Sequence, residues 1–187
     1  MSSNEELNAQ IAESNDTAVI NNQYLSFLLG VEPFAISVAK ILEIIEYDQV
    51  TLVPTAPSKY RGVVNLRGKI IPVIELTKVF GMHESEITKR TCVIIMEVLL
   101  DGELTTIGCM VDKVLIVQDI EENAIEDTPA IGTVIATEYV KGLTNIDDTF
   151  ITILDTDTIF SPSELVIGYE GNLNSASSFS NDNGSIN

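Results

Sequence analysis

The sequence has few basic residues, and this shortage limits its partners. Its 187 residues hold 10 Lys and Arg against 28 Asp and Glu, which gives a formal net charge of −18. Such a surface repels phosphate backbones and anionic lipid headgroups, so nucleic acid and bare membrane are poor candidates as partners. The longest apolar runs, such as residues 92–96, are too short to span a bilayer. The first residues also lack the basic and apolar regions of a signal peptide, so we expect a cytosolic protein.

Residues that could carry chemistry are also scarce. The single histidine, His83, precedes Glu84 as in a zinc-protease motif, but the second histidine of that motif is absent. The residues from Asp155 onward begin like a calcium-binding loop, yet Phe160 stands where such a loop requires glycine. The sequence has neither a glycine-rich phosphate loop nor the motif of a serine nucleophile. We therefore expect no catalytic, cofactor-binding or metal-binding residues, and no enzyme activity.

The chain has only two cysteines, and they flank a predicted β-hairpin turn at residues 101–102. With a two-residue loop, Cys92 faces Val111 and Cys109 faces Ile94, so the two cysteines are diagonal neighbours. Diagonal positions lie about 7–8 Å apart, too far for an unstrained disulfide. We therefore expect two buried, reduced thiols rather than a disulfide or a redox pair.

The hydrophobic pattern is largely that of short β-strands. Hydrophobic residues make up 45% of the chain, enough for a sizeable core in one domain or two small ones. Strands are predicted at residues 23–29, 34–37, 41–47, 91–99, 103–111, 113–117, 139–144 and 149–154, with two more flanking a corner at residues 65–68. Helices are predicted at residues 75–80 and 156–165. Many short strands with Gly or Asp turns favour barrels or a sandwich, and no repeat of 20–50 residues indicates a solenoid.

Both ends of the chain differ from this pattern. Residues 1–20 and 169–187 are polar, rich in Asn and Ser, and without apolar periodicity. We expect two flexible tails around a folded domain at residues 21–168.

The most informative segment runs from residue 60 to residue 76, where two apolar strands flank the polar corner at residues 65–68. Gly68 supplies the backbone freedom that a tight turn needs, and Asn65 and Arg67 place hydrogen-bonding groups beside the turn. Pro72 cannot donate to a central ladder, so we expect its strand at a sheet edge or bent at that point.

Two charges stand among apolar neighbours, Arg67 in the corner and Glu43 in an earlier strand. One interpretation is two solvated charges on strand edges. The other is an ion pair that joins two strands beside a binding groove. Spacing alone does not decide between them.

Segments across the whole folded part share a family pattern. They are Tyr24 to Gly30, Phe34 to Ile36, Ile41 to Ile44, Pro54 and Pro57, Gly62 to Gly68, Ile71 to Leu76, Val111 to Val114, Tyr139 to Gly142, and Ile151 to Asp155. In order and spacing these segments resemble the CheW-type coupling proteins of bacterial chemotaxis, over about residues 22–168. Glu75 departs from the pattern, because the family more often has Asp there.

The resemblance implies a mainly β fold of two small five-stranded β-barrel subdomains, packed side by side with short helices and a C-terminal helix. It also implies a binding groove between the barrels and no catalysis. The implied function is a scaffold that joins the cytoplasmic tip of a methyl-accepting receptor to the regulatory domain of the CheA histidine kinase, in receptor arrays at the inner membrane. An adaptor of the same fold that serves surface motility or second-messenger output is the alternative. Carried over by motif, the protein-binding residues are Ile41, Glu43, Gly62, Asn65, Leu66, Arg67 and Gly68, with Glu43 and Arg67 as a pair.

Overall fold

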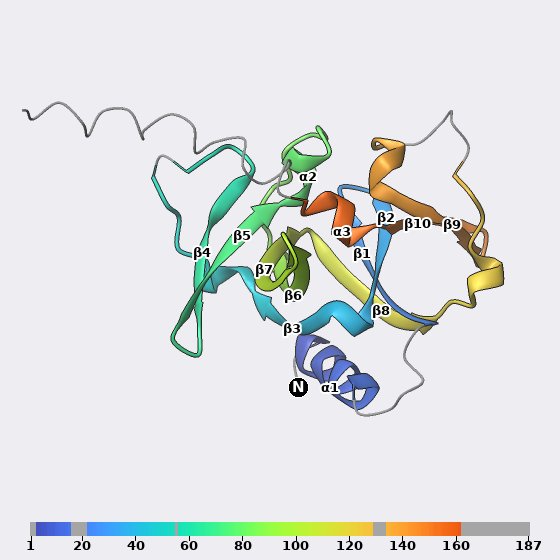
Figure 1. Ribbon diagram of the computed structural model, residues 1–187, viewed down its shortest axis with the longest axis horizontal. Coiled ribbons are helices and arrows are strands. Elements are labelled where there is room, and N and C mark those ends of the chain that lie inside the picture. Colours follow the sequence, from blue (N-terminus) through green and yellow to red (C-terminus); the bar gives the residue numbers. More distant parts are fainter. Residues whose placement is uncertain (1–2, 16–21, 55, 129–133, 162–187) are drawn as a thin grey trace, which may run out of the picture.

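The structure is a computed structural model that describes residues 3–15, 22–54, 56–128 and 134–161 (Figure 1). In these ranges ten strands form two five-stranded sheets, and short helices connect them. The predicted mainly β fold with two five-stranded units is confirmed.

One sheet takes its strands from both ends of the described chain, and we call it the terminal barrel. Its order is β8 (Lys113–Asp119), β1 (Gln23–Leu29), β2 (Glu32–Ser37), β10 (Thr149–Leu154) and β9 (Val140–Ile146). Neighbouring strands are antiparallel except β10 and β2, which are parallel. The chain beyond β8 returns to β9 through a bridge between Glu126 and Leu143, which closes the sheet on itself.

The other sheet uses the strands between β2 and β8, and we call it the central barrel. Its order is β3 (Ile41–Glu46), β6 (Cys92–Leu100), β7 (Glu103–Val111), β5 (Lys69–Glu75) and β4 (Tyr60–Leu66). It closes in the same way, because the chain beyond β3 returns to β4 through a bridge between Thr51 and Val63. The two barrels therefore have matching strand orders and matching closures.

The strand with Pro72 is not an edge strand, as one interpretation of the sequence required. It is β5, which lies between β4 and β7. Pro72 pairs with Val63 of β4, whereas the ladder between β5 and β7 begins one residue later, at Val73. A proline is tolerated inside this sheet because it stands outside the second ladder.

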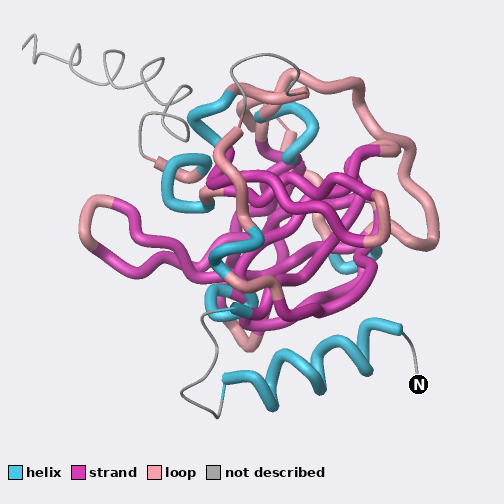
Figure 2. Tube along the Cα trace, turned by 90° about the vertical axis from the view of Figure 1, so that its right-hand side faces the viewer, coloured by secondary structure: helices cyan, strands magenta, loops and turns pink. Residues whose placement is uncertain are grey.

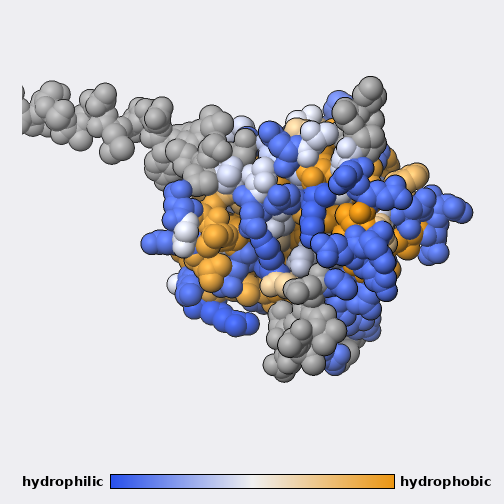
Figure 3. All heavy atoms as spheres, turned by 45° about the vertical axis from the view of Figure 1, so that its right-hand side comes forward, coloured by the Kyte–Doolittle hydropathy of each residue, from blue (hydrophilic) through white to orange (hydrophobic). Residues whose placement is uncertain are grey.

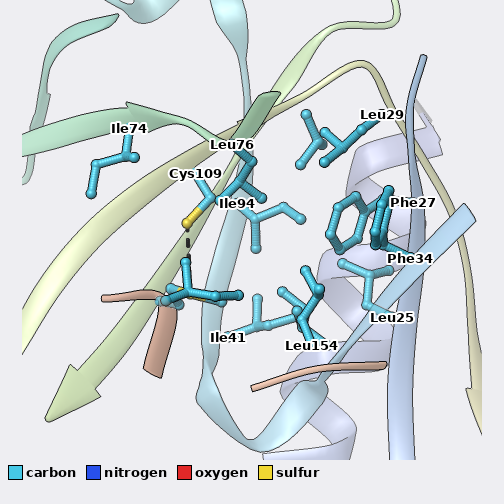
Figure 4. Packing of buried hydrophobic residues seen from close by; sticks show 14 of the residues in the cluster. Leu25, Phe27, Leu29, Phe34, Ile41, Ile74, Leu76, Ile94, Cys109 and Leu154 are labelled. Carbon is cyan, nitrogen blue, oxygen red and sulfur yellow. Dashed lines mark hydrogen bonds between the residues drawn. The ribbon is translucent and has the colours of Figure 1, made fainter. Parts of the chain in front are cut away.

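The hairpin of β6 and β7 has the predicted register. Cys92 lies opposite Val111 and Cys109 lies opposite Ile94, with the turn at residues 101–102. Both cysteines are buried and free, as expected. Cys109 Sγ lies 3.7 Å from Met96 Sδ, an interaction within the core (Figure 4).

Short helices follow corresponding strands in the two barrels. In the described ranges these are α1 (Ser3–Asn15), α2 (Leu76–Val79) after β5, α3 (Thr156–Ile159) after β10, and the 3₁₀ turns η2 (Val38–Lys40), η3 (Tyr47–Gln49), η4 (Glu122–Ala124) and η5 (Thr137–Tyr139). Of the helix predicted at residues 156–165, the structure has α3 up to Ile159, and residues 162–165 lie outside the described residues. The predicted tail at residues 169–187 lies outside the described residues.

Helix α1 occupies most of the segment for which the sequence indicates a flexible tail, so that expectation is wrong for residues 3–15. The helix lies against one side of the strands in both ribbon views (Figures 1 and 2). Leu7 and Ile11, four residues apart on one helix face, are only 7% and 1% exposed. Burial of two such side chains contributes about 1.5–3 kcal/mol each before the entropy cost of ordering the helix. Two residues are too few to produce a visible periodicity, but they are enough to seat the helix.

The main core lies between the barrels rather than inside either one. It unites buried residues of both barrels, including Phe27, Phe34 and Leu154 of the terminal barrel and Ile41 and Ile94 of the central barrel (Figure 4). Smaller clusters fill the inside of each barrel. The two barrels are therefore packed into one unit by their largest apolar cluster.

A series of four aromatic rings extends across the junction between the two barrels. Phe27 and Phe34 have ring centroids 6.1 Å apart, Phe34 and Phe80 5.9 Å, and Phe80 and Tyr139 5.7 Å. Phe80 follows α2 of the central barrel, whereas the other three belong to the terminal barrel or its connections. The rings thereby tie the two barrels together at the α2 side.

Candidate protein-binding site

The polar corner found in the sequence is the tight turn between β4 and β5. Arg67 and Gly68 both have left-handed backbones, with φ of 52° and 84°, as a two-residue hairpin turn requires. Asn65 Oδ1 accepts a hydrogen bond from the Gly68 amide at 3.0 Å. The side chain of Asn65 therefore stabilises the turn, while Asn65, Arg67 and Gly68 remain exposed.

Closure of the central barrel brings Glu43 and Arg67 together. Glu43 lies on β3 and Arg67 on the β4–β5 turn, at opposite ends of the sheet order, and Arg67 Nη2 is 3.5 Å from Glu43 Oε1. The Arg67 side chain is 85% exposed and that of Glu43 is 24% exposed. Such an exposed pair contributes about 0–1 kcal/mol to stability. Of the two interpretations that the sequence allows, the structure favours the ion pair, but in a form that leaves the guanidinium open to solvent.

Two of the predicted site residues lie beneath this surface. Ile41 is buried in the core between the barrels, opposite Met96 of β6. Gly62 is buried at the closure of the central barrel, where an added Cβ would lie 2.2 Å from the Thr51 carbonyl oxygen. Leu66 is half-buried against the core of the central barrel. The structure thus gathers Glu43, Leu66 and the turn at the surface, with Ile41 and Gly62 shaping the strands below.

Two exposed apolar residues flank the pair, and sequence reasoning missed them. The ladder between β3 and β6 shifts register between Ile41 and Glu43, and this bulge leaves Leu42 44% exposed. Ile70 lies opposite Asn65 in the β4–β5 hairpin and is 64% exposed. Figure 3 shows one face of the molecule, on which apolar areas lie beside hydrophilic ones. Apolar side chains beside an exposed charge pair are suited to protein recognition. A bulge cannot be read from apolar spacing, which explains the omission of Leu42.

A second polar cluster lies at the other end of β4 and β5. Glu75 is fully buried, and its Oε2 lies 3.0 Å from Lys78 Nζ and 3.8 Å from Arg61 Nη1. Arg61 Nε also donates to the Tyr47 hydroxyl at 2.6 Å. At the surface, Glu84 forms ion pairs with both Arg61 and Lys78. The cluster holds α2 and the following loop against the end of β5.

The electrostatics of this cluster disfavour proton transfer. The hydrogen bond to Tyr47 raises the pKa of Arg61, and the hydrogen bond to Glu75 raises the pKa of Lys78. Both groups therefore remain protonated at neutral pH, and neither can act as a general base. Burial likewise raises the pKa of Cys92 to about 11 and raises that of Cys109 further, which suppresses the nucleophilic thiolate.

Across residues 3–15, 22–54, 56–128 and 134–161, no group of three or more His, Cys, Asp or Glu side chains is placed to hold a metal ion. Among the helices of this same part of the chain, none combines the length and apolar character needed to cross a membrane.

Two closed five-stranded barrels, joined by one core and carrying an exposed charge pair beside apolar residues, define the class of two-barrel protein-binding modules. A family model described as "CheW-like domain" matches residues 23–164, which include all ten strands. The chain belongs to this family, and the resemblance seen in the sequence is confirmed. Helix α1 precedes the matched residues.

Curated relatives and a solved structure agree with this assignment. The chemotaxis protein CheW of Klebsiella aerogenes is 31% identical over 148 residues, which are 79% of this chain and 87% of the relative. That of Thermotoga maritima is 35% identical over 137 residues, 73% of this chain and 86% of the relative. The crystal structure of the scaffolding protein TtCheW from Thermoanaerobacter tengcongensis has a TM-score of 0.67 and 35% identity, and covers 74% of this chain and 87% of that protein.

Proposed function

We propose that this protein is a non-enzymatic scaffold of bacterial chemotaxis that couples methyl-accepting receptors to the CheA histidine kinase. The observation that carries the proposal is the family match across both barrels, together with relatives that are chemotaxis and scaffolding proteins. The partners are the cytoplasmic tip of the receptor and the regulatory domain of the kinase. Binding to them recruits the protein to receptor arrays on the cytoplasmic side of the inner membrane.

The receptor-facing surface in this proposal is the one around the Glu43–Arg67 pair. A helical receptor tip is amphipathic, and such a helix binds by laying apolar residues against an apolar surface. Leu42 and Ile70 provide exposed apolar area beside the pair. The guanidinium of Arg67 can donate to a partner's carboxylate or carbonyl groups, while Glu43 holds it in place from β3.

The shared core offers a route by which receptor and kinase can influence each other. The main apolar cluster and the aromatic series from Phe27 to Tyr139 both cross the junction of the barrels. Such close-packed interiors transmit strain rather than absorbing it. A scaffold of this kind can hold two partners in a defined geometry without chemistry of its own.

Charge reversal of the pair tests the site. We expect Arg67→Glu and Glu43→Arg each to weaken binding of a recombinant receptor hairpin by about tenfold or more, because two like charges then meet at the surface. The double swap should recover part of the affinity, since it restores an opposite-charge pair in reversed order. Melting temperatures should change little, because the exposed pair contributes only about 0–1 kcal/mol. Affinities are measured by calorimetry for the four proteins.

The matched control is Asp147→Arg in the turn between β9 and β10. Asp147 has a left-handed φ of 49°, close to that of Arg67, so the control reverses a charge in the corresponding turn of the other barrel. We expect it to leave receptor affinity unchanged. Loss of binding in Arg67→Glu with no recovery in the swap would show that the receptor needs the guanidinium at position 67 itself and not only an opposite-charge pair. Unchanged affinity in both single variants would show that the receptor binds elsewhere.

A further inference from the structure

Helix α1 covers a surface that is formed by strands of both barrels. It packs on β3 of the central barrel, β8 of the terminal barrel and η2 between β2 and β3, and we call this surface the α1 seat. In Figure 1 the helix lies beside β3 and β8, and in Figure 2 it is the outermost element of that side. The seat therefore lies along the junction of the two barrels.

A carboxamide joins the helix to the free edge of the central barrel. Asn8 Nδ2 donates to the Ile44 carbonyl at 2.9 Å, and Asn8 Oδ1 accepts from the Ile44 amide at 2.7 Å. β3 is the end strand of the sheet order, and the bridge that closes the barrel lies beyond it at Thr51, so the outward N–H and C=O groups of β3 can attract a partner. Asn8 satisfies the two groups of Ile44 as a neighbouring strand would. Without α1 the seat presents the unpaired N–H and C=O of Ile44 beside the part of the main core that Leu7 and Ile11 cover.

Few apolar side chains of α1 are buried against the barrels. Its buried apolar side chains are Leu7 and Ile11, and the rest of its described surface is polar or small, with exposed side chains at Ser3, Glu5, Glu6, Ala9, Gln10, Ala12 and Glu13. The helix also precedes residues 23–164, which form the family domain. Elements with few buried apolar contacts open at low free energy while the core stays folded. The barrels do not take a strand from α1, so its departure leaves both sheets complete.

The α1 seat adjoins the proposed receptor surface. Ile44, which Asn8 holds, is the neighbour of Glu43 on β3. A helix that approaches Glu43 along the free edge of β3 therefore meets α1. The seat already accepts an α-helix with two apolar side chains four residues apart and a carboxamide between them.

We propose that the α1 seat is a docking surface for a helix of the receptor tip, and that α1 is a built-in competitor for it. The identity of the partner rests on the proposed function. With α1 seated, only the fraction of molecules with an open seat can bind, so the apparent dissociation constant rises by the inverse of that fraction. Release of α1 should therefore strengthen receptor binding without any new contact.

The test loosens α1 in the full-length protein. Asn8→Asp removes the N–H donor and brings a negative charge to the Ile44 carbonyl, and Leu7→Ala with Ile11→Ala removes the two apolar anchors. Ala9→Gln is the matched control, because Ala9 is an exposed helical position. We expect both loosened proteins to bind a recombinant receptor hairpin about tenfold more tightly than wild type, which corresponds to an open fraction of about one tenth in wild type. The control, and the affinity of every variant for the kinase regulatory domain, should be unchanged.

Hydrogen exchange on the wild-type protein is the second readout, independent of any substitution. The α1 amides should exchange faster when the receptor hairpin is added, and at an unchanged rate when the kinase domain is added. Equal or weaker receptor binding by the loosened proteins, or α1 amides that stay protected in the complex, would overturn the competition and leave the scaffold function standing. If the hairpin binds neither wild type nor any variant, both proposals fail. Should the variants unfold, the exchange result on wild type decides.

Discussion

At the scale of single residues, burial decides what Cys92 and Arg67 can do. Cys92 lies in the core between the barrels, and burial raises its pKa from 9.0 to about 11. Arg67 has the opposite environment, with an exposed guanidinium and one carboxylate at 3.5 Å. The thiol is therefore shielded from chemistry, whereas the guanidinium is presented for recognition.

The thiols give a prediction on pH. A shift of two pKa units lowers the thiolate fraction of Cys92 about 100-fold at about pH 8, and lack of access slows reaction further. We expect a disulfide reagent to label the native protein at least that much more slowly than the unfolded chain. The folded state keeps the proton while the unfolded thiol loses it, so stability should fall as pH rises from 9.0 through about 11.

Melting temperatures across that range, for wild type and for a variant with alanine at both cysteines, measure the second effect. The variant should lose less stability between these pH values, because the thiols no longer contribute. Fast labelling of folded protein would instead indicate that the core opens locally at the β6–β7 hairpin.

At the scale of elements, the two barrels use corresponding positions differently. Glu75 precedes α2 and Asp155 precedes α3. Asp155 Oδ1 accepts from the amides of Asp157 and Thr158 at 3.1 and 3.3 Å, and so caps α3. Glu75 makes no such cap and reaches Lys78 and Arg61 instead. The side chain of Glu75 is one methylene group longer than that of Asp155, so its carboxylate reaches Lys78 and Arg61 rather than the amides of α2.

The cap of α3 can be tested by substitution. We expect Asp155→Ala to lower the free energy of unfolding by about 1 kcal/mol, because two helix amides lose their acceptor. Asp155→Asn should retain most of the stability, since its carbonyl oxygen can still accept. Denaturant unfolding of the three proteins measures the difference. Equal losses in both variants would assign the effect to the negative charge rather than to the cap.

At the scale of the whole molecule, the chain contains two similar units with exchanged strands. The central barrel orders its strands as β3-β6-β7-β5-β4 and the terminal barrel as β8-β1-β2-β10-β9. By position, β1 to β5 correspond to β6 to β10, but the first two strands of each unit pair with the last three of the other. Gly62 and Gly142 mark the correspondence, because each lies at its barrel's closure where a Cβ would meet backbone or side-chain atoms.

This exchange predicts how a cut chain behaves. Fragments 1–86 and 87–187 each contain five of the ten strands described, but neither contains all five strands of one barrel. We expect each fragment alone to lack a cooperative unfolding transition, because its main apolar surfaces have no partner. An equimolar mixture should recover the far-ultraviolet dichroism and cooperative melting of the intact protein. A cooperative transition in either fragment alone would contradict the strand exchange.

Local features of this chain were predictable because they depend on neighbouring residues. The register of the β6–β7 hairpin follows from a two-residue turn, and the turn at Arg67 and Gly68 follows from its glycine. Family resemblance added the two-barrel plan and the pairing of Glu43 with Arg67. The similarity of the two units was not predicted, because corresponding residues such as Gly62 and Gly142 are 80 residues apart, farther than the repeats of 20–50 residues that indicate a solenoid.

The sequence by itself determined the strands, the tight turns, the reduced thiols and the family. Only the tertiary structure decided which strands share a barrel, that α1 is seated across both, and that Arg67 is exposed while Gly62 is buried. The physical reason is distance along the chain. Turns and strand patterns are set by a few adjacent residues, whereas burial depends on segments such as Thr51 over Gly62, or α1 over β3, that meet only when both barrels have closed.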